Sequence, residues 1–203
     1  MRVHWNVRRN EIPRQVDPIQ KRERIALAVI EIMASRGIEE VSLRDVAAEA
    51  GCSMGMVQHY FSTKDDMLAF ASGYLADRIL HKVSAEIAEA SGIGTARAAL
   101  RITMLHLLPL DEERRREARV WLAFLARATV RPELTPVMRE ARVVAHDFFL
   151  ERVRAAIAAG ELQPSRDGNA DARSLHAFAD GMVGLVITGV YSADEAEAAI
   201  DHQ

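Results

Sequence analysis

The sequence predicts an all-α fold, and three observations support this prediction. Apolar residues recur every three or four positions along most of the 203 residues, which is the spacing of one buried helix face. Alternation of polar and apolar residues, which is typical of strands, never continues for long between turn residues. Glycine and proline interrupt the helical pattern at intervals, so we expect several helices of moderate length.

Composition indicates an ordinary folded domain in a reducing compartment. With 49% hydrophobic residues the chain can form a globular core. Its longest apolar run, residues 182–190, is about half of the roughly 20 residues that a membrane-spanning helix needs. The basic N-terminus lacks the apolar stretch of a signal peptide, and the single cysteine, Cys52, cannot form an intrachain disulfide. We therefore expect a soluble, cytoplasmic protein with no membrane segment.

The first predicted helix covers residues 19–35. Its apolar positions form one face, and Arg36 and Gly37 supply the cation and the glycine that are typical of a helix end. Those apolar positions are Ile25, Val29, Ile32 and Met33.

Two short helices follow, separated by a glycine-containing turn. Ser42 is a good N-cap for the first of them, with Asp45 near its positive end, and Gly51 ends this helix after two turns. Ser53 is placed to cap the second, which reads MGMVQHYF. Two short helices around such a turn are typical of a helix-turn-helix unit.

The remaining residues predict longer helices. We expect helices over residues 64–90, 95–108, 112–129, 136–160 and 171–191, with a short acidic one from about residue 193. The breaks between them fall at residues 91–94, Pro109, Pro132 with Pro136, and the polar segment 161–170. Within the predicted helix 136–160, helical spacing relates Val137, Ala141, Val144 and Phe148.

The helix after Ser53 has the composition of a helix that enters a DNA major groove. Gly55 costs a free helix roughly 1 kcal/mol relative to alanine, and a close approach of its backbone to another surface would explain it. Gln58 and His59 can donate and accept hydrogen bonds, whereas Val57 and Phe61 have the spacing to dock the helix on its partner.

The segment RERIALAVIEIMASRGIEEVSLRDVAAEAGCSMGMVQHYFSTKDDML resembles the DNA-binding domain of the TetR family of bacterial transcriptional regulators, nearly position by position. The resemblance implies that Arg44 reaches a base edge or a phosphate. It also implies phosphate contacts from Ser42, Tyr60 and Lys64, and groove contacts from Ser53, Met54, Gly55, Met56, Gln58 and His59.

Gln58 departs from the family pattern. Most of the family has tyrosine at this position, two residues before the residue equivalent to Tyr60. A glutamine can instead read adenine with two hydrogen bonds, a contact worth about 1 to 3 kcal/mol of discrimination.

The C-terminal part resembles the branch of that family that contains the glycine-betaine-pathway repressor, through EARVWLAFLARATVRPEL and SLHAFADGMVGLVITGVY. This implies an unidentified small-molecule effector, no cofactor, and a cavity among the later helices. Large apolar side chains that could line the cavity, or could equally form plain core, are Met104, Leu108, Trp121, Phe124, Phe148 and Met182. The aromatic members of this set could face a cationic ligand.

Small residues also lie along one side of an apolar helix, at Ala177, Gly181, Gly184 and Thr188. They indicate close helix packing within the chain or across a dimer. The resemblance implies that this helix and helix 136–160, with Phe149, form a homodimer interface. Two symmetry-related recognition helices would then read a palindromic operator in double-stranded DNA.

These predictions divide the chain into three parts. Residues 1–18 form a basic arm or a disordered leader, residues 19–66 the helix-turn-helix DNA-binding domain, and residues 67–203 a ligand-binding and dimerisation domain. Residues 1–24 hold seven basic and three acidic side chains, which is compatible with a polyanionic partner at this end.

An enzyme is the main rival class, and the sequence argues against it. The seven histidines include no HExxH or other metal-ligand spacing, so we expect no metal. Phosphate-binding glycine motifs and GxSxG are absent. The run DEERRREAR at residues 111–119 predicts a solvated helix face with pairs at i, i+4 rather than an acidic-partner site. Cys52 reads as a structural residue or, less favoured, a redox sensor.

Overall fold

The computed structural model describes residues 18–90 and 95–202. Within these ranges it contains nine α-helices, two short 3-10 helices and no strand, so the all-α prediction is confirmed. In chain order the elements are α1 (Pro18–Arg36), η1 (Ile38–Glu40), α2 (Leu43–Glu49), α3 (Met54–Tyr60), α4 (Lys64–Ala90), α5 (Ala96–Leu107), α6 (Glu112–Ala128), η2 (Pro132–Leu134), α7 (Thr135–Ala158), α8 (Gly168–Ile187) and α9 (Ala193–Asp201).

The helix boundaries follow the predicted caps closely, with one exception. Helix α8 begins and ends a few residues before the predicted range 171–191. It begins earlier because the Asp167 carboxylate accepts hydrogen bonds from the backbone N–H groups of Asn169 and Ala170. It ends earlier because Gly189 takes a left-handed conformation with φ 76°. The predicted break at residues 91–94 and, apart from Pro18, the predicted arm at residues 1–18 lie outside the described residues.

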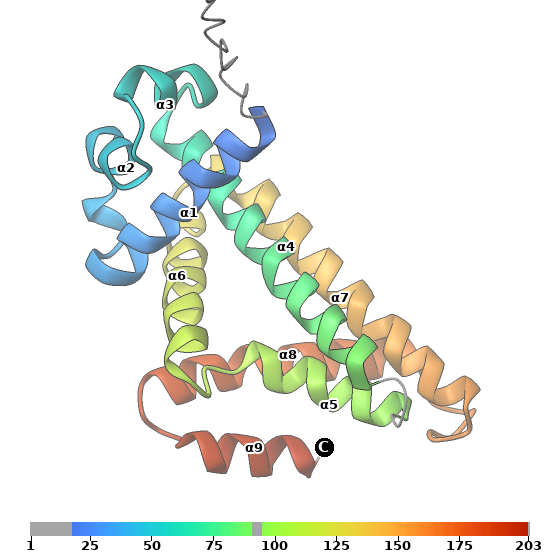
Figure 1. The fold of residues 1–203 in the computed structure, drawn as a ribbon. Coiled ribbons are helices and arrows are strands. Elements are labelled where there is room, and N and C mark those ends of the chain that lie inside the picture. Colours follow the sequence, from blue (N-terminus) through green and yellow to red (C-terminus); the bar gives the residue numbers. More distant parts are fainter. Residues whose placement is uncertain (1–17, 91–94, 203) are drawn as a thin grey trace, which may run out of the picture.

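The helices form a small head on a triangular body (Figure 1). Helices α1, α2 and α3 make the head. Helices α4 and α7 run side by side along one edge of the body, α6 forms the second edge, and α5 with α8 forms the third, beyond which α9 lies.

One core cluster holds the head together and reaches into the body. It joins buried side chains of α1, α2 and α3 to the start of α4, and it includes Val120 and Phe124 of α6. Phe124 is 1% exposed, and full burial of a side chain of this size stabilises a fold by about 1.5 to 3 kcal/mol. The cluster therefore crosses the predicted boundary between residues 66 and 67, and the division into domains stays a prediction.

A second cluster forms the base of the body from α5, α7, α8 and α9. Helix α7 contributes Phe149, Leu150, Val153 and Ala156 to it. The stripe expected from sequence spacing is therefore not the buried face of α7. Its members Val137, Ala141 and Phe148 are half-buried, and Val144 is exposed.

Candidate nucleic-acid interface and interior cavity

Serine hydroxyl groups cap the N-termini of the two short helices of the head, α2 and α3. The Ser42 hydroxyl oxygen accepts a hydrogen bond from the Asp45 backbone N–H at 3.1 Å and donates its proton to the Asp45 carboxylate. The Ser53 hydroxyl oxygen accepts from the Met56 backbone N–H at 3.2 Å. Both helix starts predicted from the sequence are confirmed by these contacts.

Helix α3 has one buried and one open face. Val57 is fully buried, and Phe61, which follows the helix, is 3% exposed in the first core cluster. Opposite them lies an exposed face that we call the reading face, made of Ser53, Met54, Gly55, Gln58 and His59. Helix α3 lies at the outer edge of the head in Figure 1, so nothing in the described chain covers this face.

The other residues predicted to contact DNA differ in how exposed their side chains are. Ser42 and Arg44 are exposed at the start of α2, whereas Met56, Tyr60 and Lys64 are half-buried. The Tyr60 ring packs edge-on to the His59 ring, with 5.1 Å between ring centroids. Such packing limits the rotamers of both rings before any partner binds.

Gly55 is not required by the fold of the free chain. A Cβ built at this position would meet only the Ser53 hydroxyl oxygen, at 4.0 Å, and the backbone of Gly55 has an ordinary helical conformation. A helical glycine that its own chain does not need, on an exposed face, is consistent with a surface that must approach the backbone closely.

Arg24, which no sequence pattern singled out, positions the turn before α3. It lies on α1, and its guanidinium donates hydrogen bonds to the backbone carbonyls of Ala50 at 2.5 Å and Gly51 at 2.6 Å. These carbonyls end α2, and Gly51 has φ 58°. Arg24 thus fixes the turn between α2 and α3 and, through it, the direction of the reading face. No local motif could have predicted a contact across 26 residues.

An interior cavity of about 80 Å³ lies in the body. Its apolar wall comes from α4, α5, α6, α7 and α8, and its lining includes Ile79, Leu80, Leu107, Trp121 and Val183. This volume holds about two to three water molecules, so any larger ligand would have to widen it.

Of the residues predicted to line the pocket, Trp121 lines this cavity and the others do not. Phe124 belongs to the first core cluster, and Leu108 and Met182 belong to the second. Met104 borders a separate depression near α9. Phe148 lies under the Arg152 guanidinium, whose carbon is 3.2 Å from the ring centroid. Burial of these side chains in helix contacts, which spacing alone does not reveal, accounts for the difference.

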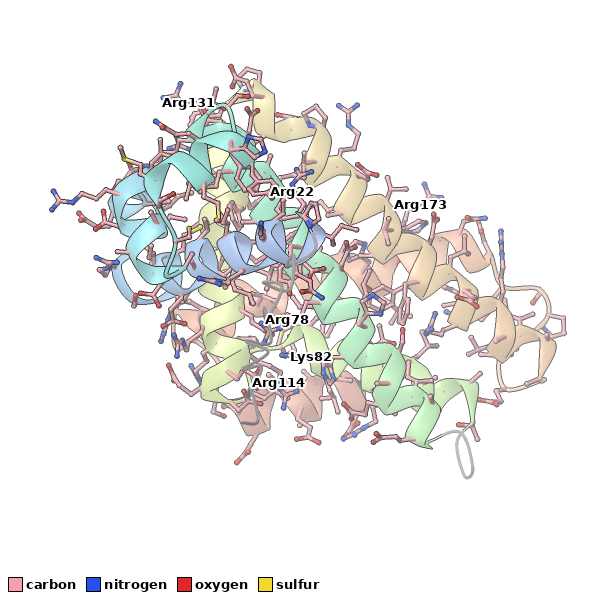
Figure 2. All side chains as sticks on the ribbon, turned by 45° about the horizontal axis from the view of Figure 1, so that its top comes forward. Arg22, Arg78, Lys82, Arg114, Arg131 and Arg173 are labelled. Carbon is pink, nitrogen blue, oxygen red and sulfur yellow. The ribbon has the colours of Figure 1, made fainter. Side chains whose placement is uncertain are left out.

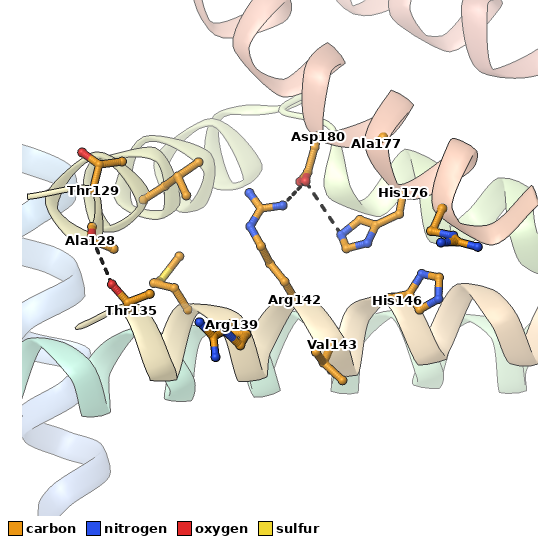
Figure 3. Close-up of a pocket in the computed structure, with 13 residues that line it drawn as sticks. Ala128, Thr129, Thr135, Arg139, Arg142, Val143, His146, His176, Ala177 and Asp180 are labelled. Carbon is orange, nitrogen blue, oxygen red and sulfur yellow. Dashed lines mark hydrogen bonds and ion pairs between the residues drawn. The ribbon is translucent and has the colours of Figure 1, made fainter. Parts of the chain in front are cut away.

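A charged wall separates the cavity from a surface groove of about 700 Å³ between α6, α7 and α8. Arg142, His176 and Asp180 line both spaces. Figure 3 shows the Arg142 guanidinium paired with the Asp180 carboxylate, and His176 Nε2 lies 3.9 Å from that carboxylate. Burial lowers the pKa of the His176 imidazole; the Asp180 carboxylate opposes this and the Arg142 charge adds to it, and the net direction is downward, so the neutral imidazole predominates near pH 7.

Helix α6 also carries ion pairs to its neighbours. Arg127 contacts Asp65 at the start of α4 at 3.0 Å and Glu39 of η1 at 3.8 Å, and Arg116 pairs with Glu31 of α1. The DEERRREAR segment was expected to form pairs within its own helix. Asp111 with Arg114 and Glu112 with Arg119 do pair within it, whereas three other charges, on Glu113, Arg116 and Glu117, reach α1 or α4, because both helices pack beside α6.

The opposite end of α6 is tied to α4. Lys82 Nζ lies 2.6 Å from Glu113 and 2.8 Å from Glu117, and Arg78, Lys82 and Arg114 lie close together here (Figure 2). The Lys82 contacts hold the pKa of the Glu113 carboxyl below its usual range.

The predicted dimer residues divide into two groups. Phe149 is 1% exposed inside the second core cluster, so in this chain it packs in the core rather than on the surface, and its place in an interface stays a prediction. Ala177, Gly181 and Thr188 are exposed and Gly184 is half-buried on one side of α8, with Leu185 beside them 37% exposed.

The described residues contain no group of three or more His, Cys, Asp or Glu side chains placed to hold a metal ion. Among these same residues, no helix is long and apolar enough to cross a membrane.

The fold and the reading face define a helix-turn-helix DNA-binding protein. Residues 26–70 match the family described as bacterial regulatory proteins, tetR family, and residues 96–203 match the BetI-type transcriptional repressor C-terminal domain. The chain belongs to the TetR family of transcriptional regulators, with a C-terminal domain of the BetI type. It is therefore a transcriptional regulator and not an enzyme.

Individual relatives agree with this assignment. The HTH-type transcriptional regulator PksA of Bacillus subtilis is 32% identical over 175 residues, which cover 84% of this chain and 80% of PksA. A transcriptional regulator from Rhodococcus sp. Rha1 of known structure is 36% identical with a TM-score of 0.74, covering 89% of this chain and 92% of that one. A regulator from Saccharomonospora viridis, solved in complex with choline, is 25% identical with a TM-score of 0.77, covering 91% and 95%.

Substituting Gly55 separates a folding role from a binding role. We expect Gly55→Ala to keep or raise the free energy of unfolding, by up to about 1 kcal/mol from helix propensity. Its affinity for operator DNA should fall at least about tenfold, because the added methyl group blocks close approach. Gly73→Ala on α4, where an added Cβ meets nothing within 4 Å, is the matched control and should leave DNA affinity unchanged. Denaturant unfolding and fluorescence anisotropy titration would measure the two quantities.

Proposed function

We propose that the chain is a ligand-responsive repressor that binds a palindromic operator as a homodimer and releases it when an effector fills the interior cavity. The observation that carries this proposal is the reading face, exposed, polar and containing a glycine that the free chain does not need. A repressor of this kind acts in the cytoplasm, because the bacterial DNA that carries its operator lies there.

On DNA, the head would bind through two kinds of contact. Ser42, Tyr60 and Lys64 would contact phosphates and position the head. Arg44 and the reading face would contact base edges, with Gln58 reading adenine through its amide. The fixed turn held by Arg24 would limit the reorganisation needed on binding.

A dimer would form through the exposed sides of α7 and α8. Small residues on α8 such as Gly181 allow close helix approach, and Leu185 on α8 with Val144 on α7 supplies exposed apolar surface outside the groove lining. Two heads related by symmetry would then contact half-sites about one helical turn apart or more.

The effector would act through α6. Trp121 of α6 lines the cavity, while Phe124 of the same helix packs in the core of the head and Arg127 contacts η1 and α4. A ligand that widens the cavity would displace α6 and change the direction of the head. The choline complex of the Saccharomonospora viridis regulator supports a small molecule in this role.

Selection of bound sequences from a random DNA pool tests the proposed DNA recognition. We expect a palindrome. Arg44→Ala should weaken binding to it with unchanged folding, and Lys64→Ala should weaken binding to all sequences and lower the salt slope by about one unit. An enzyme or a protein-binding adaptor would retain no preferred sequence, and that outcome would remove the proposal.

The dimer has its own test. Leu185→Glu should convert the protein to monomer and lower operator affinity at least about tenfold, since a buried unpaired carboxylate is costly at a packed interface. Leu27→Glu on α1 is the matched control, because Leu27 is 39% exposed against 37% for Leu185. Sedimentation velocity would report the masses. A Leu185→Glu protein that remains dimeric would show that the interface lies elsewhere.

A further inference from the structure

The cavity and the surface groove share three lining residues, of which Arg142 and Asp180 form an ion pair between the two spaces. Arg142 and Asp180 are each about one-third exposed, at 32% and 31%, and both line the cavity on one side and the groove on the other. The third shared residue is His176, one turn before Asp180 on α8. If Arg142 moved away from Asp180, the cavity and the groove would connect through the gap between them. The pair therefore has the position of a gate.

The groove favours an anion. Its lining includes the cations Arg139, Arg142 and Arg173 and a single carboxylate, that of Asp180. Its histidines, His146 and His176, are stacked with 6.5 Å between ring centroids, and burial lowers the pKa of His176. A charged group that enters from this side meets a net positive potential.

The cavity does not favour a quaternary ammonium group. Such groups bind in cages of several aromatic rings, and Trp121 is the only Phe, Tyr or Trp in the cavity lining. The Arg142 guanidinium carbon already lies 5.9 Å from the Trp121 ring centroid. The ring therefore already faces a cation. Of the other lining residues, seven are aliphatic and six ionisable, and the ionisable ones include two carboxylates, Asp180 paired with Arg142 and Glu117 paired with Lys82.

We propose that the effector is an amphipathic monocarboxylic acid whose apolar part enters the cavity beside Trp121 and whose carboxylate binds Arg142 in place of Asp180. This inference rests on the proposed effector role of the cavity. The ligand carboxylate replaces the Asp180 carboxylate as the partner of Arg142, because a planar guanidinium binds any carboxylate through the same pair of hydrogen bonds.

Charge balance then involves His176. When Arg142 turns to the ligand, Asp180 loses its cation, and His176 loses a neighbour that disfavours its protonated form. The groups that act on His176 are Asp180 on α8 and Arg142 and His146 on α7. The other charged or titratable residues of the two spaces that His176 lines are Arg139 and Arg173 in the groove and His106, Arg114 and Glu117 in the cavity. With Arg142 neutralised by the ligand, Asp180 favours the imidazolium, so His176 takes up a proton from solvent as the acid binds.

The proton uptake fixes the sign of the pH dependence. The pKa of His176 is higher in the complex than in the free protein, so the affinity for the acid rises as the pH falls from about 8 to about 6. The rise cannot exceed about tenfold per pH unit, because one proton is taken up. The ligand carboxylate stays ionised over this range, since ordinary carboxyl pKa values are about 4.

Three ligands with the same eight-carbon chain and different polar groups test whether a carboxylate is required. They are octanoate, octan-1-ol and octyltrimethylammonium. The sequence contains two tryptophans, and Trp5→Phe leaves Trp121 as the only one, so its fluorescence reports binding in the cavity of the full-length protein. Octanoate should bind about tenfold to a hundredfold more tightly than the alcohol, the range of a charge-assisted hydrogen bond. The ammonium compound should bind no more tightly than the alcohol. Equal or tighter binding of the ammonium compound would overturn the proposal.

Two substitutions with opposite expected effects keep the test independent of folding. Arg142→Gln should remove the preference for octanoate over octan-1-ol. Asp180→Asn removes the competing carboxylate and should tighten octanoate binding by about tenfold and abolish its pH dependence. Arg154→Gln, an exposed arginine on the same helix outside the groove lining, is the control and should bind as the parent protein does. Weaker octanoate binding by Asp180→Asn would contradict the exchange of carboxylates.

Operator binding is measured in parallel to separate this inference from the proposed function. If the protein selects a palindrome but binds no octanoate, the proposed DNA recognition stands and the proposal of a monocarboxylic acid effector is contradicted. A protein that binds octanoate yet retains no DNA sequence contradicts the proposed function and leaves the acid site standing. Release of the selected operator by octanoate, and not by the alcohol at equal concentration, is the result expected if both hold.

Discussion

The packing of helix α6 is the constraint on which the rest of this structure depends. Val120 and Phe124 are buried in the cluster that holds the head together, and Ala118, two residues before Val120, is buried in the cluster that forms the base of the body. Trp121, between these positions, lines the cavity. Close-packed interiors transmit displacements because they contain little free volume, so a change at the cavity wall cannot stay within the body. The head and the cavity therefore share one rigid element.

The ion pairs of α6 contribute little to the free energy of unfolding, but they determine which neighbouring elements α6 contacts. Exposed pairs such as Arg116 with Glu31 contribute about 0 to 1 kcal/mol each. Arg127 is different, because its side chain is only 14% exposed and it contacts both η1 and the first turn of α4. Lys64, predicted to contact a phosphate, lies next to Asp65 in that same turn. A shift of Arg127 would therefore act on the first turn of α4, where the chain leaves α3, and α4 itself lines the cavity further along through Ile79 and Leu80.

The sequence predicted most of the fold because the relevant signals are local. Serine caps at Ser42 and Ser53 and glycines at Gly37 and Gly51 mark helix ends through contacts within a few residues. The reading face followed from spacing around Val57. What could not be predicted depends on contacts between distant helices. Arg24 reaches across to the turn, and Phe124 faces the head instead of the cavity, because of how α1 and α6 cross. For the same reason, spacing did not show that only Trp121 of the predicted pocket residues lines the cavity, since large apolar residues look alike in sequence wherever they pack.

The distance between the two heads tests most directly whether α6 transmits the state of the cavity. Cys52, the only cysteine in the chain, lies half-buried in the turn before α3, so one spin label there gives one probe per head in a dimer. Labelled protein must first retain operator binding. Ala118→Leu fills the cavity from α6, and Ala126→Leu places the same side chain on the exposed side of that helix. Pulsed electron paramagnetic resonance should show a changed distance distribution for Ala118→Leu and an unchanged one for Ala126→Leu. A folded Ala118→Leu dimer with the distribution of the parent protein would contradict the account.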